Sequence, residues 1–147
     1  SRIMSLKDGL KKMSKSDPSD LSRINLTDSK EEILNKIKKA KTDPLPLPED
    51  QKDLAKRPEA ENLIGIYSSL KNQNLENSVN EFNGKNFSEF KEKLSDIIIE
   101  KIEPISKEIK KLLKDEKYLD SILLEGSDKA DKIASKKIKE MKELVGF

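Results

Sequence analysis

Apolar residues recur at helical spacing along most of this chain, and this pattern predicts a mainly α-helical protein. From residue 59 onward, charged side chains flank each apolar stripe, as in helices with one buried and one solvated face. No alternation of apolar and polar residues occurs after residue 26, so we expect no strand there. The front end differs, because Ile3, Met4 and Leu6 form a short apolar stretch that predicts a strand end or an extended entry to a loop.

Capping residues and prolines mark where the helices begin. Asp28 followed by Glu31 predicts a helix N-terminus, because this spacing satisfies two free backbone N–H groups reciprocally. Asn86 followed by Glu89 has the same spacing. Pro58 suits the first turn of a further helix, where its missing N–H is not needed. The apolar stripes are Ile33, Leu34, Ile37 and Ala40 after Asp28, Leu63, Ile64, Tyr67 and Leu70 after Pro58, and Phe87, Phe90, Leu94, Ile97, Ile98 and Ile102 after Asn86. Further stripes run through Ile105, Ile109, Leu112 and Leu113, and then through Leu119, Ile122, Leu123, Ala130, Ile133, Ala134, Ile138, Met141 and Val145.

Three positions predict turns or breaks. Asp8 and Gly9 predict a turn, because glycine tolerates positive φ and aspartate bonds to nearby backbone. Pro104 should kink or split the helix that begins near Asn86. Gly126 should end one helix and allow a new one to start after it.

A proline-rich stretch is the best candidate for a domain boundary. Pro44, Pro46 and Pro48 alternate with leucines, which favours an extended linker without internal hydrogen bonds. We therefore divide the chain into residues 1–42, a linker over residues 43–58, and a helical domain over residues 59–147. Charge follows this division, since residues 1–42 carry eleven Lys or Arg against six Asp or Glu, a net charge of +5.

Composition excludes several kinds of chemistry. The chain has no Cys and no His, which rules out disulfides, thiol nucleophiles, imidazole bases and the usual zinc ligands, and we expect no metal site. No apolar run exceeds three residues, as in Ile97–Ile99, so we expect no membrane segment and a cytoplasmic protein. The chain begins with Ser1 and not with Met, and we expect it to start inside a longer protein.

Residues 11–18, which read KKMSKSDP, form what we call the lysine–serine loop. Lysine ammonium groups act as point charges on phosphate oxygens, and serine hydroxyls and free backbone N–H groups add hydrogen bonds. Pro18 prevents a helix from running through this segment. Composition alone allows either a solvated basic turn or a loop that wraps a polyphosphate.

A second group of lysines recurs at helical spacing near the end of the chain. Lys129, Lys132, Lys136 and Lys139 lie beside an apolar stripe, where they would contact a nucleic-acid backbone or simply face solvent. The lysines of the helix after Asp28 favour a solvated face, with a specific phosphate contact as the alternative; they are Lys30, Lys36, Lys38, Lys39 and Lys41. The acidic pairs of the chain are adjacent in sequence and point apart on a helix, which disfavours acid–base catalysis.

The lysine–serine loop resembles the KMSKS loop of class I aminoacyl-tRNA synthetases, with Lys12-Met13-Ser14-Lys15-Ser16 as the matching pentapeptide. Further matches in the same order make the whole chain similar to the C-terminal part of bacterial or mitochondrial-type tryptophanyl-tRNA synthetases. These matches are Arg2-Ile3-Met4-Ser5-Leu6, Ile24-Asn25-Leu26, Asp28-Ser29, Lys36-Ile37 with Ala40, Thr42-Asp43, Glu61-Asn62-Leu63-Ile64, Ile66-Tyr67, Gly84-Lys85, Phe90-Lys91, Pro104-Ile105, Glu125-Gly126, Lys129-Ala130 and Ala134-Ser135.

The resemblance implies specific roles for the loop. Lys12 and Lys15 would be catalytic, contacting the ATP polyphosphate together with the hydroxyls of Ser14 and Ser16. Main-chain groups of Ile3 and Met13 would border the adenine. ATP with Mg²⁺ would be the substrate complex, and a mainly α fold would join the KMSKS-loop remnant of a Rossmann catalytic domain to an α-helical anticodon-binding bundle.

The resemblance also implies partners. Tryptophan tRNA would contact the helical part, for which we name Arg57, Lys129, Lys132 and Lys136. L-tryptophan would bind through a catalytic domain that this chain lacks, so the chain alone should be inactive. The full-length enzyme would be a homodimer, and the isolated fragment is expected to lack the main dimer interface. The alternative is a stand-alone helical RNA- or protein-binding module without catalysis.

Overall fold

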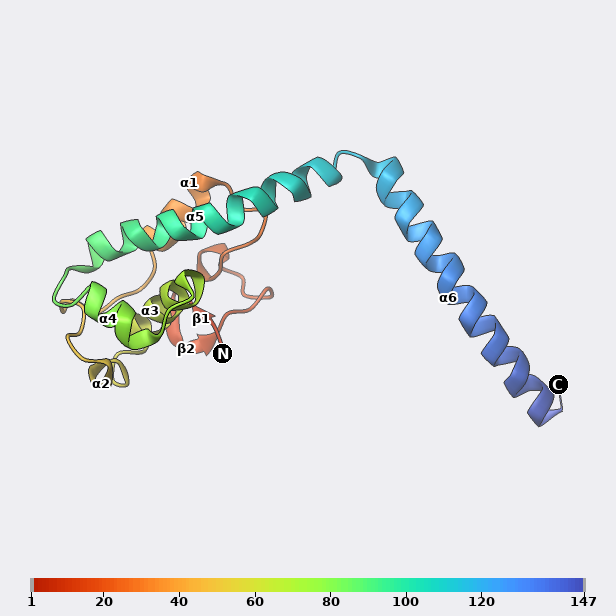
Figure 1. Cartoon of the computed structure of the whole chain (residues 1–147), viewed down its shortest axis with the longest axis horizontal. Coiled ribbons are helices and arrows are strands. Elements are labelled where there is room, and N and C mark those ends of the chain that lie inside the picture. Colours follow the sequence, from red (N-terminus) through yellow and green to blue (C-terminus); the bar gives the residue numbers. More distant parts are fainter. Residues whose placement is uncertain (1, 147) are drawn as a thin grey trace. The chain divides into compact units, whose positions relative to one another are not determined.

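The computed structural model describes residues 2–146 and is mainly α-helical over that range, which confirms the predicted fold class (Figure 1). It contains strands β1 (Met4–Ser5) and β2 (Asp8–Lys12), the short 3-10 helix η1 (Asp20–Ser22), and six α-helices. The chain separates into two compact units, the first ending at Lys107 and the second beginning at Glu108. The lysine–serine loop lies in the first unit.

Strands β1 and β2 form an antiparallel hairpin in which Met4 faces Lys12. The predicted turn at Asp8 and Gly9 is wrong, because the turn lies at Leu6 and Lys7 and Gly9 belongs to β2. Gly9 serves close packing instead. A Cβ at this position would lie only 2.5 Å from the carbonyl carbon of Pro58 in the neighbouring helix.

Helix α1 (Lys30–Lys38) begins one residue later than predicted. Ser29 is the N-cap, and its side chain and that of Glu32 form the reciprocal capping pair. Asp28 does not cap the helix, because its carboxylate accepts hydrogen bonds from Lys36 and from the backbone N–H of Asn25. The contact with Lys36 therefore replaces the capping role that the local spacing predicts for Asp28.

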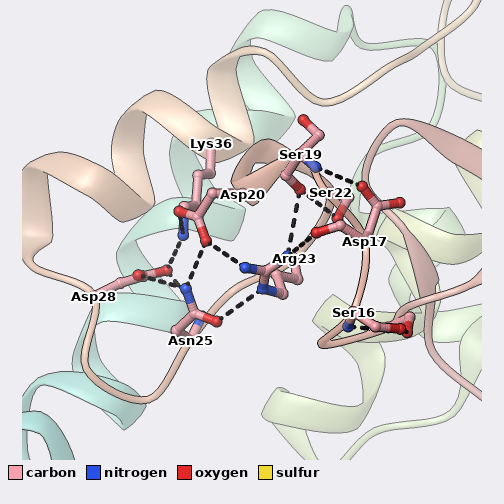
Figure 2. Close-up of polar contacts among 10 residues, drawn as sticks. Ser16, Asp17, Ser19, Asp20, Ser22, Arg23, Asn25, Asp28 and Lys36 are labelled. Atoms are coloured by element: carbon pink, nitrogen blue, oxygen red, sulfur yellow. Dashed lines mark hydrogen bonds and ion pairs between the residues drawn. The ribbon is translucent and has the colours of Figure 1, made fainter.

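Lys36 is the most unusual side chain of α1, because it is charged and only 3% exposed. Its Nζ lies 2.6 Å from Oδ2 of Asp28 and 2.6 Å from Oδ2 of Asp20, as Figure 2 shows. Burial alone would lower the pKa of Lys36, but the hydrogen bonds to Asp20 and Asp28 outweigh it and the pKa is raised. The prediction that Lys36 belongs to a solvated face is wrong.

The remaining helices of the first unit are α2 (Gln51–Leu54), α3 (Pro58–Lys71), α4 (Leu75–Glu81) and most of α5 (Phe87–Leu112). Pro58 opens α3 as predicted. Asn86 accepts the N–H of Glu89 at 3.0 Å, but the Glu89 carboxylate pairs with Lys85, so only half of that predicted capping box forms.

Helix α5 runs through Pro104 without splitting. Proline removes the hydrogen bond to the carbonyl four residues earlier, which belongs to Glu100. Glu100 and Pro104 are both exposed, so water can satisfy that carbonyl. The helix is therefore not split at Pro104, and that part of the prediction is wrong.

The core of the first unit joins the hairpin turn, α1 and α2–α5. Tyr67, Phe82 and Phe90 pack edge to face, with ring centroids 4.8 to 5.9 Å apart. Of the predicted stripe residues up to Ile102, Leu34 is exposed, Leu70 and Ile102 are partly buried and the others are buried. The predicted stripes after Ile102 contain no buried residue. The buried cluster also includes Leu6, Leu47, Leu54, Ala60, Val79, Phe82 and Ile99. Leu47 and Leu54 belong to the predicted linker, so that segment packs on the unit. The functional boundary within residues 43–58 stays a prediction.

Helix α3 also holds the hairpin through the side chain of Asn62. Its Oδ1 accepts the N–H of Met4 and its Nδ2 donates to the carbonyl of Met4, both at 2.9 Å. The amide thus pairs with β1 on the edge opposite β2. Close by, Lys41 and Glu59 form an ion pair at 2.8 Å.

The second unit consists of the end of α5 and helix α6 (Glu116–Val145). Asp115 caps α6 by accepting the N–H of Tyr118. The predicted break at Gly126 is wrong, since the helix continues through it; an isolated glycine costs a helix only about 1 kcal/mol. No described side chain of α6 is buried. Within residues 2–146, no helix is long and apolar enough to cross a membrane.

Two glycines provide a matched test of the packing between β2 and α3. Gly9→Ala should destabilise the first unit by about 1–3 kcal/mol, because the added methyl meets the backbone of Pro58 and Glu59. Gly65→Ala, inside α3 with no atom within 4 Å of the new Cβ, should stabilise by about 0.5–1 kcal/mol. Urea unfolding of both variants measures the two effects, and equal effects in the two variants would contradict the contact.

Lys36→Met should lower the free energy of unfolding by about 3–5 kcal/mol, because Asp28, only 5% exposed, loses its cation. Lys38→Met, at an exposed position of the same helix, should change it by less than about 0.5 kcal/mol. Urea unfolding measures both.

The pH dependence gives an independent check. The pKa of Lys36 is raised, so its contribution to the free energy of unfolding is lost as the pH rises through a value above 10.5. Hydrogen bonding to Lys36 lowers the pKa of Asp20, so the contribution of Asp20 is lost as the pH falls through a value below 3.8. The stability difference between the parent and Lys36→Met should therefore stay constant from about pH 5 to 9 and shrink at both extremes. A difference that changes steadily across that middle range would contradict this.

Candidate functional site

The lysine–serine loop leaves the end of β2 and turns back toward η1. Lys11 and Lys12 are the last residues of β2, so the loop proper begins at Met13. The N–H of Met13 donates to the carbonyl of Ile3 at 3.1 Å, which extends the hairpin pairing by one bond. The start of the loop is therefore held by the residue that precedes β1.

The middle of the loop is a tight polar turn. The hydroxyls of Ser14 and Ser16 lie 2.9 Å apart, and the N–H of Ser16 donates to Oγ of Ser14 at 3.3 Å. Lys15 stands at the tip between the two serines. All three residues are exposed, so a ligand has access to them.

The ammonium groups of Lys12 and Lys15 have neither an ion-pair partner nor a hydrogen-bond acceptor in the described part of the chain. Both side chains are exposed. Lys11 differs, because its Nζ lies 3.9 Å from a carboxylate oxygen of Asp8. Two uncompensated cations three residues apart provide a site that attracts a polyanion.

An open pocket of about 960 Å³ lies beside the loop. Apolar side chains and the two lysines contribute to the same pocket, so it suits a ligand with a flat apolar part and a charged part. Its lining residues are Arg2, Ile3, Lys12, Met13, Ser14, Lys15, Arg23, Ile24, Asn25 and Leu26. Of the predicted ATP-binding residues, Ser16 is the one that does not line this pocket.

The far end of the loop is held by Arg23, as Figure 2 shows. Its Nη1 donates to the carbonyl of Asp17 at 2.9 Å, and its Nη2 pairs with Oδ1 of Asp20 at 2.9 Å. Its Nε donates to Oδ1 of Asn25 at 3.1 Å. A hydrogen bond from Lys36 lowers the pKa of Asp20, so this carboxylate is ionised at neutral pH.

Reasoning from residue types missed Arg23 and Asn25 as lining residues of the pocket. Asn25 occurred in the ordered resemblance, but nothing in the local sequence indicated that its amide would bridge two carboxylates. Its Nδ2 lies 3.0 Å from Asp20 Oδ1 and 3.1 Å from Asp28 Oδ1. These contacts depend on how the segment folds back, and no spacing rule predicts them.

The predicted tRNA-binding residues fall in both compact units. Arg57 lies in the first unit, where its guanidinium donates to both carboxylate oxygens of Asp43, at 2.9 and 2.6 Å, and to the carbonyl of Pro46 at 2.7 Å. Lys129, Lys132 and Lys136 are exposed on α6 in the second unit.

Along α6, a spacing of three and then four residues places these lysines on one side of the helix. Lys129 pairs with Glu125, whereas Lys132 and Lys136 have no ion-pair partner among the described residues. No group of three or more acidic, His or Cys side chains able to hold a metal ion occurs in residues 2–146.

Comparison with known proteins places these features in context. The family described as "tRNA synthetases class I (W and Y)" matches residues 1–116. The Tryptophan–tRNA ligase of Rhizobium meliloti is 49% identical over 146 residues, which cover 99% of this chain and 41% of that protein. The Tryptophan–tRNA ligase of Rickettsia felis is 50% identical and is covered to 44%. The chain thus spans about two fifths of the length of these relatives.

Solved structures share the fold. The tryptophanyl-tRNA synthetase of Campylobacter jejuni, complexed with ADP and tryptophan, matches 100% of this chain and 44% of its own, with a TM-score of 0.77 at 21% identity. The enzyme of Mycoplasma pneumoniae matches 99% of this chain, with a TM-score of 0.72 at 24% identity. The family match covers most of the chain, and the chain therefore belongs to the class I tRNA synthetases of the tryptophan and tyrosine type, as the resemblance of its KMSKS loop predicts.

Proposed function

We propose that this chain works as part of a tryptophan–tRNA ligase, in which it supplies the ATP-binding loop and helices that contact tRNA. The observation that carries the proposal is the pair of unpaired cations, Lys12 and Lys15, at one pocket with the hydroxyl of Ser14. The similarity to Tryptophan–tRNA ligases over 99% of the chain supports the choice of amino acid.

The reaction gives the loop a physical task. In amino-acid activation, the tryptophan carboxylate attacks the α-phosphorus of ATP, and the bond from that phosphorus to the bridging oxygen of pyrophosphate breaks. Negative charge grows on the departing pyrophosphate. Donors aimed at that charge, here Lys12 and Lys15 with the hydroxyls of Ser14 and Ser16, stabilise the transition state more than the ground state.

The pocket suits the rest of ATP as well. Ile3 and Met13 lie on its apolar side, and we propose that their main-chain groups border the adenine. ATP would enter as its complex with Mg²⁺. L-tryptophan would bind to parts of the enzyme that this chain does not contain, and the full-length enzyme would be a homodimer.

For tRNA, we propose that residues 59–147 carry the contacts, after a linker at residues 43–58 and a catalytic end at residues 1–42. Lys132 and Lys136 are the strongest candidates, because their charges are unpaired within the described residues and lie on one face of α6. Lys129 would have to exchange Glu125 for a phosphate. Arg57 would have to give up Asp43, so its more direct role is to join the linker to α3.

In the full-length protein that carries this chain, Lys15→Ala and Lys12→Ala should each slow tryptophan-dependent ATP–pyrophosphate exchange by about 100- to 1000-fold. This is the effect of losing about 3–4 kcal/mol of transition-state stabilisation. Tryptophan binding, followed by fluorescence or calorimetry, should stay within about threefold of the parent, since neither lysine contacts the amino acid.

Lys11→Ala is the matched control, because Lys11 is an exposed neighbour that does not line the pocket. Its exchange rate should equal that of the parent. If Lys12→Ala and Lys15→Ala also keep the parental rate, the proposed role of the loop is wrong.

Filter binding to tryptophan tRNA tests the helical part. Changing the anticodon bases should weaken binding to the full-length protein, and Lys132→Ala with Lys136→Ala should lower the salt slope by about one per lysine. Lys142→Ala, on a different face of α6, should leave the slope unchanged. Binding that is sensitive to salt but has the same affinity when the anticodon bases are changed would favour the stand-alone RNA-binding alternative.

A further inference from the structure

The lysine–serine loop is fixed at both ends and free only in between. At its start, the Met13–Ile3 hydrogen bond continues the strand pairing. At its far end, Asp17 accepts the N–H of Ser19 at 2.8 Å through Oδ1, and its carbonyl accepts from Arg23 at 2.9 Å. Within residues 2–146, the residues between these anchors bond to one another through the serine hydroxyls and to Asp17 through the turn that begins at Ser14.

Arg23 can hold the far end of the loop because its guanidinium contacts three different residues. One nitrogen holds the loop backbone at Asp17, a second pairs with Asp20, and the third donates to Asn25. The side chain is only 18% exposed. A planar fork with fixed donor directions can make these bonds together, and a lysine at the same place cannot.

The anchor is in turn attached to the core. Asp20 contacts Arg23 with one oxygen and Lys36 with the other, at 2.9 and 2.6 Å. Lys36 is buried on α1 between Ile33 and Ile37, which are 1% and 0% exposed. Figure 2 shows these charges as one continuous path from α1 to the loop. Positive and negative groups alternate along it, so each buried charge is compensated.

We propose that Arg23 is a positioning residue for the phosphate-binding loop. By fixing the backbone at Asp17 relative to α1, it confines the movable part to Ser14, Lys15 and Ser16 and keeps the Lys15 ammonium beside the pocket. The proposal rests on the function proposed above for the loop. Arg23 lines the same pocket, but each of its three guanidinium nitrogens already has a partner in the protein, so we assign its effect to the loop and not to direct contact with the ligand.

The test uses the full-length protein with Arg23→Lys, which keeps the positive charge beside Asp20 but loses the bonds to Asp17 and Asn25. We expect the rate of ATP–pyrophosphate exchange per active site to fall by about 10- to 100-fold, because small misplacements of reacting groups have effects of this size. Active sites are counted by the burst of adenylate formation. Tryptophan affinity and the melting temperature should stay close to the parental values.

A purely structural role would lower the number of active sites and leave the rate per site unchanged, so the active-site count separates the two roles. Lys91→Gln is the matched control, because Lys91 also donates to backbone carbonyls, those of Lys38 and Ala40, but does not line the pocket beside the loop. Its rate per active site should equal that of the parent, even if its melting temperature falls.

Hydrogen exchange provides a second readout in the same proteins. Peptides that cover residues 14–22 should exchange faster in Arg23→Lys than in the parent, whereas peptides from α3 should not change. If Lys15→Ala slows the reaction but Arg23→Lys matches the parent in rate and exchange, the positioning role is wrong and the loop function stands. If Lys15→Ala also matches the parent, the loop function itself fails.

Discussion

Burying the charge of Lys36 is the constraint on which the functional end of this chain depends. An ammonium group that is 3% exposed requires close carboxylates, and two supply them: Asp28, next to the helix, and Asp20, eight residues earlier. Meeting this requirement folds the segment between them back onto α1. The same requirement moves the start of α1 to Ser29, since Asp28 is no longer available as a cap.

Lysines have two different roles in this chain, depending on whether carboxylates surround them. Lys36 is surrounded by acceptors and holds structure together. Lys12 and Lys15 lie fewer than 25 residues away in a segment with similar composition, yet they have no acceptor among the described residues. The nearby carboxylates contact other groups: Asp17 accepts from Ser19, Asp20 contacts Arg23 and Lys36, and Asp8 pairs with Lys11. The network thus keeps Asp20 from pairing with Lys12 or Lys15.

Features with a local cause could be predicted from the sequence, and features with a tertiary cause could not. The apolar stripes of α1, α3 and the first part of α5 predicted most of the core, and Pro58 predicted the start of α3. The predicted break at Gly126 and the predicted split at Pro104 do not form. Both positions are exposed, where an isolated glycine costs about 1 kcal/mol and water can satisfy the carbonyl that proline leaves unpaired. The lysine–serine loop was identified by its residue order. Its far anchor was not, because the three bonds of Arg23 join residues whose proximity only the folded chain defines.

The unpaired loop lysines also have a thermodynamic consequence. Like charges held three residues apart repel one another, so the folded chain without a ligand carries an electrostatic cost at the loop. A polyanion that binds only the folded form removes this cost and adds stability that grows with ligand concentration. The hydrogen bonds at Met13 and Asp17 hold the backbone on both sides of Lys15, which limits how far the loop can carry this lysine from Lys12. Relief of the repulsion between Lys12 and Lys15 therefore adds to the binding free energy of a ligand with closely spaced phosphates.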